Sequence, residues 1–306
     1  MTLNKDEMIL FNNKGNIPND KNNQYEELIK NRWIYPLNDG QYIYSSDFQQ
    51  IMLMFDEIIL SWAREDNAQE YLYPDLYKIT DLDRCKYIEQ FRNHCLFVTA
   101  DEMSNIEARV KSKQYINNPA VCMHCYIQFK DSIVDSENFV TITAKGKCKR
   151  NESNGFTTLE RLLDFTMREV VFIGTREFVL KKRQEYIERS ILLMKKLNLC
   201  GNISLSNDPF YTKEGNVKAE FQRKFKLKYE LNLINYDNNH SIAVGSFNYH
   251  NSNFSKAYNI RLSNGQLAST ACVAFGLERL AYAYISQRGI MSCYQALNDY
   301  IRQECI

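Results

Sequence analysis

The stretch LASTACVAFGLERLAYAYI, Leu267 to Ile285, decides the fold prediction because it joins a strand pattern directly to a helix pattern. Small and β-branched residues up to Val273 predict a buried strand, and the residues from about Gly276 predict a helix. Glu278 and Arg279 interrupt this otherwise apolar run. Because a buried guanidinium is costly without an anion, Arg279 needs either a phosphate or an acid such as Glu278 as its partner.

A strand that turns into a helix at a small residue is suited to binding a nucleotide. Gly276 lets a ligand approach the backbone, and Arg279 lies in the first helical turn, where the helix dipole favours anions. The pattern A-x-G-x-x-R also occurs by chance. An ion pair between Arg279 and a neighbouring acid therefore remains the alternative to phosphate binding.

Composition excludes several classes of protein. The 306 residues are 44% hydrophobic, and 38 Lys and Arg against 37 Asp and Glu leave a formal net charge of +1. This balance provides no general attraction to nucleic acid. The nine Cys show no small-scaffold spacing, and neither a secretory signal nor an apolar membrane span is present. We therefore expect reduced thiols in a cytoplasmic protein that makes no contact with a membrane.

Strand patterns dominate the middle of the chain, and helix patterns flank them. Helices are predicted over 44–66 and 176–199. Strands are predicted over 139–148, 165–175, 218–234 and 240–262. The predicted class is α+β, with a largely antiparallel β-sheet flanked by helices. Residues 1–25, which are rich in Asn and Lys, are predicted to be poorly ordered, and 26–306 to form the main domain.

A second segment adds candidate ligand-binding residues. In KCKRNES (147–153), Arg150 and Glu152 occupy alternate positions and would share one face of a strand. The following LERLLDFTMREVVFIGT supplies Phe165, Arg168 and Glu169 on the expected partner strand. Arg150 could bind an α-phosphate, Glu152 could accept a hydrogen bond from a base, and Phe165 could stack on it. The alternative is an exposed hairpin with cross-strand charge pairs.

These segments, in order, resemble class II aminoacyl-tRNA synthetases. KCKRNES…LLDFTMREVVF resembles motif 2, ACVAFGLERL resembles motif 3, and YLYPDLYKITDLDRCKYIEQF is a weaker match to motif 1, with Pro74 at its key position. PAVCMHCY, DPF and SFNYH extend the likeness to zinc-dependent archaeal seryl-tRNA synthetase and its truncated homologues, the amino acid:[carrier protein] ligases. The likeness covers roughly residues 70 to 290, and it implies a class II synthetase-like fold.

The resemblance implies a catalytic zinc ion held by Cys122, Glu169 and Cys272. A Cys₂Glu set leaves one tetrahedral position open, and in the family the α-amino group of the substrate takes it. From the residues alone, both Cys could equally be buried thiols. CMHCY also offers His124 and Cys125 as ligands; strand alternation would place Cys122 and His124 on one face, and we choose Cys122.

The resemblance also implies ATP with Mg²⁺, bound by Arg150, Glu152, Phe165, Arg168 and Arg279, with Arg150 and Arg279 acting on the phosphates during catalysis. Class II enzymes place a carboxylate for Mg²⁺ on the strand before motif 3. This chain has none between Asn238 and His250, and Glu230 and Asp237 are the nearest acids, so the Mg²⁺ ligands stay unassigned. Asn248 is expected to bind substrate, unless it is a strand-end amide satisfied by the backbone.

The implied function is ATP-dependent activation of a small amino acid, such as glycine or alanine, as an aminoacyl adenylate. Transfer to the phosphopantetheine thiol of an acidic carrier protein would follow, in a homodimer. No heptad pattern indicates a coiled-coil arm for tRNA, which favours a carrier protein over tRNA. Two alternatives remain: a tRNA-acting, seryl-like synthetase that borrows its tRNA-binding part from another chain, and a non-catalytic paralogue that binds nucleotide or amino acid. The basic stretch Lys181–Arg189 is either a docking face for the carrier or a solvated helix face.

Overall fold

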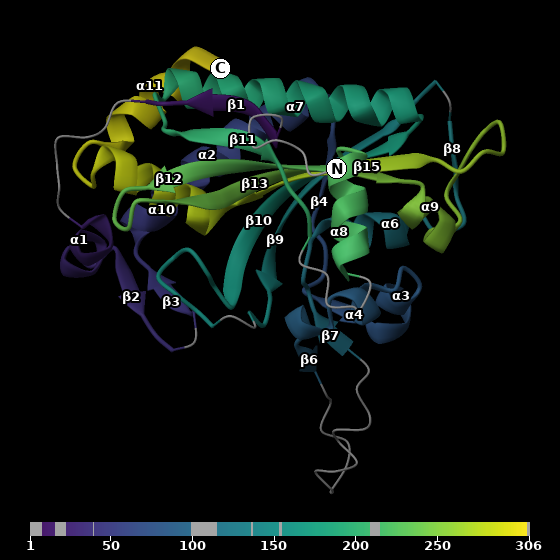
Figure 1. Cartoon of the computed structure of the whole chain (residues 1–306), viewed down its shortest axis with the longest axis horizontal. Coiled ribbons are helices and arrows are strands. Elements are labelled where there is room, and N and C mark those ends of the chain that lie inside the picture. Colours follow the sequence, from purple (N-terminus) through teal and green to yellow (C-terminus); the bar gives the residue numbers. More distant parts are fainter. Residues whose placement is uncertain are drawn as a thin grey trace, which may run out of the picture.

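The structure is a computed structural model that describes residues 8–15, 23–38, 40–98, 115–135, 137–152, 155–208 and 215–304. These residues are arranged around one large sheet with helices on both of its faces (Figure 1). The predicted α+β class is confirmed. In the described part of the chain, no helix combines the length and the apolar character needed to cross a bilayer.

The large sheet has eight strands within the described residues. Their spatial order is β1 (Ile9–Asn13), β11 (Gly201–Leu205), β12 (Lys228–Asn235), β13 (His240–Asn251), β15 (Ser269–Gly276), β10 (Asp164–Gly174), β9 (Val140–Lys149) and β4 (Gln69–Tyr71). Only β4 runs parallel to its neighbour, β9, and every other pair is antiparallel. The prediction of a largely antiparallel sheet is therefore confirmed.

The helices and the short strands surround this sheet. The helices are α1 (Gln24–Lys30), α2 (Ser46–Glu65), α3 (Ile79–Asp83), α4 (Tyr87–Gln90), α6 (Cys122–Gln128), α7 (Arg176–Lys196), α8 (Gly215–Lys224), α9 (Asn253–Tyr258), α10 (Leu277–Arg288) and α11 (Cys293–Glu304). Among the short strands, β2 (Ile34–Pro36) pairs with β3 (Tyr42–Tyr44), and β8 (Ile133–Val134) pairs with β14 (Arg261–Leu262). The strand β7 (Tyr115–Asn117) lies between β5 (Leu76–Lys78) and β6 (Phe97–Val98) and pairs with both.

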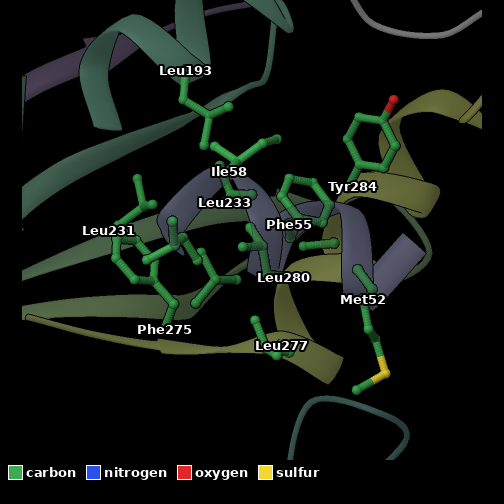
Figure 2. Packing of buried hydrophobic residues seen from close by; sticks show 14 of the residues in the cluster. Met52, Phe55, Ile58, Leu193, Leu231, Leu233, Phe275, Leu277, Leu280 and Tyr284 are labelled. Atoms are coloured by element: carbon green, nitrogen blue, oxygen red, sulfur yellow. The ribbon is translucent and has the colours of Figure 1, made fainter. Parts of the chain in front are cut away.

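One face of the sheet is sealed by α2, α7 and α10. Figure 2 shows Phe55 and Ile58 of α2 packed with Leu193 of α7, Leu233 of β12 and Phe275 of β15. All five side chains are almost fully buried. Burying aromatic and aliphatic side chains stabilises a fold by about 1.5–3 kcal/mol each. This core fixes the strands whose opposite face forms the candidate site.

The opposite face of the sheet is only partly covered. A second apolar cluster lies there, with contributions from α6, α9 and the sheet of β5, β6 and β7. Along β10 the two faces alternate, because Val170 and Phe172 belong to the first cluster and Val171 and Ile173 to the second. Glu169 therefore points to the same face as Val171.

Arg168 lies on the sealed face and is separated from the other predicted site residues. Its Nε and Nη2 donate to the two carboxylate oxygens of Asp56 on α2, at 2.7 and 3.1 Å, and its Nη1 donates to Glu70 at 2.7 Å. Burial alone would raise the pKa of Asp56, but the hydrogen bonds from Arg168 and Lys145 lower it. Arg168 joins β10 to α2, so the earlier assignment of Arg168 to the ATP site is corrected.

Replacing Arg168 should destabilise the fold strongly. Arg168→Met removes one partner of a buried pair and leaves Asp56 short of a cation, which costs about 3–5 kcal/mol. Urea unfolding measures the loss. The double variant Asp56→Leu/Arg168→Met should recover part of it, because both buried charges are then gone and the charges left behind, Lys145 and Glu70, are 37% and 50% exposed and reach water. A double variant less stable than the single one would contradict this account. Since the folded-state pKa of Asp56 is lowered, the contribution of the pair is lost as the pH falls through that value.

Four local predictions need correction. The first is the strand predicted over 240–262, which ends at Asn251 and is followed by helix α9. Ile9–Asn13, which lie in the segment predicted to be poorly ordered, form β1 and pair with β11, whereas residues 1–7 and 16–22 lie outside the described residues. The predicted strand over 218–234 begins as helix α8, where Lys, Glu and Gln favour a helix and Val217 and Phe221 have helical spacing. Arg150 follows the end of β9 instead of lying within it.

Candidate active site

A cavity of about 440 Å³ opens on the face of the sheet opposite α2, α7 and α10. It lies over β10, β12, β13 and β15, beside the start of α6. Every predicted site residue except Arg168 lines it: Cys122, Arg150, Glu152, Phe165, Glu169, Asn248, Cys272 and Arg279. Of the quoted motif DPF, Asp208 also lines the cavity, whereas residues 209 and 210 lie outside the described residues.

The strand register and α6 bring three ligand-type side chains together. Cys272 on β15 pairs with Val171 of β10, and Val171 lies two residues from Glu169. The side chains of Cys272 and Glu169 therefore both point to the cavity face. Cys122, at the start of α6, reaches the same point from outside the sheet. The ligand atoms of Cys122, Glu169 and Cys272 all lie within 4.8 Å of one another, and all three residues are buried.

His124 and Cys125 are not part of this cluster. The strand alternation used to compare them with Cys122 is wrong, because residues 122–128 form a helix. The Nε2 atom of His124 lies 2.8 Å from the carbonyl oxygen of Pro74, and its ring stacks on Tyr77. The helix turns these neighbours away from the point where Cys122 meets Glu169 and Cys272.

The cluster concentrates negative charge in a buried place. Burial, together with the nearby Cys272, raises the pKa of Glu169 to about 7. The hydrogen bond between the two sulfurs raises the pKa of Cys122 and lowers that of Cys272, because the pair shares a proton. The amide of Val121 donates to Glu169 at 2.8 Å, and no ion pair joins Glu169 to a cation in the described part of the chain. Two thiols and a carboxylate without a counter-cation fit a divalent metal such as zinc.

Arg279 has no carboxylate as an ion-pair partner among the described residues. Its Nη1 lies 3.5 Å from the carbonyl oxygen of Ala243. Glu278, which is 0% exposed, instead accepts hydrogen bonds from the backbone N and the hydroxyl of Thr166, at 2.7 and 2.8 Å. Pairing of Arg279 with Glu278 is therefore excluded. Burial lowers the pKa of Arg279, and the guanidinium lines the cavity, where an anionic ligand would stabilise it.

Arg150 presents a second guanidinium to the cavity. Its Nε donates to the carbonyl oxygen of Pro119 at 2.8 Å, and its guanidinium carbon lies 5.3 Å from the centre of the Phe165 ring. No ion pair to a carboxylate is formed by Arg150 within the residues that the structure describes. Glu152 lies nearby, with its carboxylate 3.9 Å from Nε of Arg161.

Several charged residues of the cavity were missed by sequence reasoning. Arg161 supplies a third guanidinium, and Lys228 donates to Asp208 at 2.7 Å and lies 3.0 Å from Glu230. The alternation of Lys228 and Glu230 within a predicted strand was a usable signal, because it places both on one face. Asp208 gave no such signal, since a loop residue has no periodicity.

Asp237, one of the two acids nearest to the missing Mg²⁺ carboxylate, is used elsewhere. Its two carboxylate oxygens accept from the backbone N of Gln24 and of Tyr25, at 2.7 and 2.9 Å. The hydroxyl of Tyr282 donates to it as well. Asp237 therefore attaches α1 to the body of the protein and does not line the cavity.

Comparison with known proteins identifies the family. No protein-family model matches the chain. The chain is 30% identical over 247 residues to amino acid–[acyl-carrier-protein] ligase 2 of Bradyrhizobium diazoefficiens, an alignment that covers 76% of this chain and 73% of the relative. The chain belongs to the family of amino acid–[acyl-carrier-protein] ligases. The chain is also 28% identical over 267 residues to amino acid–[acyl-carrier-protein] ligase 1 of the same organism. This alignment covers 82% of the chain and 81% of the relative.

Seryl-tRNA synthetases share the fold of this ligase-family chain. A type-2 serine–tRNA ligase of Methanococcus aeolicus is 25% identical over 292 residues, which are 86% of this chain and 56% of the relative. Among solved structures, M. kandleri SerRS in complex with A. aeolicus tRNASec aligns with a TM-score of 0.82 at 21% identity, covering 97% of this chain and 64% of that one. The cytoplasmic serine–tRNA ligase of Naegleria fowleri, in complex with AMP, aligns with a TM-score of 0.75 at 10% identity, covering 94% and 62%. The predicted class II synthetase-like fold is confirmed.

Proposed function

We propose that this chain uses ATP to activate an amino acid as its adenylate and then transfers the aminoacyl group to the phosphopantetheine thiol of a carrier protein. One observation supports the activation step above all. Arg150 and Arg279 line the same cavity as the buried cluster of Cys122, Glu169 and Cys272, and neither guanidinium forms an ion pair with a carboxylate in the described residues. The names of the relatives support a carrier protein as the acceptor.

In the first step, a carboxylate oxygen of the amino acid attacks the α-phosphorus of ATP. The bond from that phosphorus to the bridging oxygen breaks, and pyrophosphate leaves with the electron pair. Arg150 and Arg279 hold the phosphates and neutralise the charge that develops on them, so positioning and electrostatics lower the barrier. In the second step, the carrier thiol attacks the acyl carbon, loses its proton to solvent, and forms a thioester as AMP leaves.

The cluster of Cys122, Glu169 and Cys272 would hold a zinc ion. When bound, zinc supplies an open, Lewis-acidic position for the α-amino group of the substrate. Asn248 lies next to this position, because its Nδ2 is 3.5 Å from Sγ of Cys272 and 3.0 Å from the hydroxyl of Ser246. Both of these partners are side chains, which favours a role in binding substrate over an amide satisfied by the backbone. The proposed substrate is a small amino acid such as glycine or alanine, and Mg²⁺ enters with ATP.

The surface proposed for carrier docking is α8 and not α7. On α7, Lys182 pairs with Asp66, Arg183 donates to the carbonyl oxygen of Lys226, and Arg189 pairs with Asp66. These cations of the stretch Lys181–Arg189 are used within the chain.

The α8 surface consists of exposed apolar residues with exposed cations beside them. Val217, Phe221 and Phe225 are 68%, 53% and 53% exposed at a spacing of four residues, and Lys224 and Lys226 are exposed beside them. Aromatic anchors surrounded by cations suit an acidic protein partner. The side-chain amide of Gln222 on α8 donates to Asp208 at 2.8 Å, which ties this surface to the wall of the cavity.

Changes on the α8 surface should impair carrier loading without changing activation. Phe221→Ala and Lys224→Glu should each lower kcat/KM for the carrier protein by about 5- to 10-fold, since an interface anchor contributes more than 1 kcal/mol. Amino-acid-dependent exchange of pyrophosphate into ATP should stay at the wild-type rate. Lys181→Glu on α7, where the side chain is 77% exposed, is the matched control. Equal losses for Lys181→Glu and Lys224→Glu would contradict docking on α8.

Acceptor identity is tested by offering the purified protein a phosphopantetheinylated carrier protein or total tRNA, with ATP and the activated amino acid. Formation of a thioester on the carrier, labile to hydroxylamine at neutral pH, is the expected result. Transfer to tRNA without transfer to the carrier would replace the proposal with a seryl-like synthetase. Loss of both transfers and of activation would support a non-catalytic paralogue.

A further inference from the structure

His250, at the end of β13, contacts the Cys272 sulfur and lines the cavity. Its Nε2 atom lies 3.6 Å from Sγ of Cys272. Its Nδ1 atom lies 3.3 Å from the hydroxyl of Tyr126 on α6 and 3.3 Å from the hydroxyl of Thr270 on β15. The imidazole therefore connects two hydroxyls on one side to a cluster sulfur on the other.

The hydrogen-bond partners of His250 fit a ring that carries its proton at Nε2. Either hydroxyl can donate to Nδ1, and a thiolate of Cys272 that ligates a metal can only accept from Nε2. The Nε2–H group then donates to Sγ of Cys272. A sulfur that accepts such a bond has more of its charge stabilised when it is a thiolate.

Aromatic packing keeps the ring of His250 in this orientation. Phe254 of α9 stacks on Tyr126 with the ring centres 4.2 Å apart. The same Phe254 meets the His250 ring edge to face, with the centres 4.8 Å apart. The imidazole is thus held by side chains from α6, α9 and β15, which limits its rotation away from Cys272.

We propose that His250 is a positioning residue that orients the Cys272 thiolate and stabilises it as a metal ligand. This inference rests on the proposed metal site, but it concerns a residue that is not itself a ligand of the cluster. Partners that donate to a metal ligand typically contribute 10- to 100-fold to metal affinity. The Nε2–H···Sγ bond also withdraws electron density from the sulfur, which changes the charge-transfer absorption of a bound metal.

The test compares two substitutions of His250. Glutamine extends a side-chain N–H to about the place of Nε2, whereas alanine removes the donor. For His250→Ala, we expect Zn²⁺ binding, measured by chelator competition, to weaken by about 10- to 100-fold. We also expect the thiolate-to-metal charge-transfer band of the Co²⁺-substituted protein to move to longer wavelength. His250→Gln should recover most of the affinity and of the band position.

Two further variants control for indirect effects. His124→Gln changes a histidine of α6 that lies outside the cluster, and it should bind Zn²⁺ as the wild type does. Tyr126→Phe keeps the stacked ring and removes one donor to Nδ1, so it should shift affinity and band in the direction of His250→Ala by a smaller amount. Tyr126→Phe also tests the inference if His250→Ala does not fold.

Three outcomes would overturn the inference. The first is wild-type affinity and wild-type absorption in His250→Ala. The second is an equal loss in His250→Gln and His250→Ala, which would indicate packing instead of a hydrogen bond. If His250→Ala does not fold, the corresponding contradictory result is wild-type affinity and absorption in Tyr126→Phe. The third is wild-type protein that binds no metal, which contradicts the metal site of the proposed function as well, whereas the first two leave that site intact.

Discussion

Arg279→Ala should lower amino-acid-dependent ATP–pyrophosphate exchange by about 10²- to 10³-fold, the loss typical of removing one group that stabilises transition-state charge. The guanidinium faces the cavity, and its one hydrogen bond within the described residues, 3.5 Å long, is to the carbonyl oxygen of Ala243. Removing it therefore costs the fold little. The rate of exchange at saturating ATP, measured for the wild type and the variant, gives the size of the effect.

Stability provides the control for this variant. Burial lowers the pKa of Arg279, which means that burying its charge is unfavourable in the free protein. Arg279→Ala should therefore unfold at the same temperature as the wild type or at a higher one. Arg302→Ala on α11, where the arginine is exposed, should leave exchange unchanged. A clear loss of stability together with the loss of exchange would assign Arg279 to the fold and not to phosphate binding.

Cys272→Ser should remove the metal and activation together. A ligand set of two thiols and a carboxylate loses most of its preference for zinc when one thiol becomes a hydroxyl, so the metal content should fall from about one ion per chain to nearly none. Exchange should fall by more than about 100-fold, since even partners of metal ligands contribute 10- to 100-fold. Elemental analysis and the exchange assay on the same sample measure both effects.

Cys125→Ser is the matched control for the metal site. Cys125 is buried on the same helix as Cys122 but lies outside the cluster, so the variant should keep its zinc and its activity. Glu169→Gln keeps the size of the third ligand and removes its charge, and it should lose metal like Cys272→Ser. If Cys272→Ser kept its zinc and Cys125→Ser lost it, the assignment of Cys122, Glu169 and Cys272 as the ligands would be contradicted.

Residues with a clear periodicity were predictable from the sequence. The strand–helix junction before Glu278 is observed where it was predicted, since β15 ends at Gly276 and α10 begins at Leu277. Alternation places Phe165 and Glu169 on the cavity face of β10, and it places Arg168 on the opposite face. The same alternation therefore already separated Arg168 from Phe165 and Glu169, and it argued against placing Arg168 in the ATP site.

Other features depend on contacts that no local pattern records. Cys122 was assigned from the resemblance. The strand alternation used to compare it with His124 and Cys125 does not exist, because residues 122–128 form α6, a seven-residue helix too short to show its period. The interaction of Lys228 with Asp208 joins a strand to a loop twenty residues earlier, and the contact of His250 with Cys272 depends on the pairing of β13 with β15. Such contacts follow from the order of strands in the sheet.

The most direct test of the account is amino-acid-dependent ATP–pyrophosphate exchange by the wild-type protein across the twenty amino acids, with the metal content measured on the same sample. We predict exchange with one or two small amino acids and about one zinc ion per chain. Absence of exchange with every amino acid from a folded, zinc-containing protein would contradict the proposal that this cavity forms an aminoacyl adenylate.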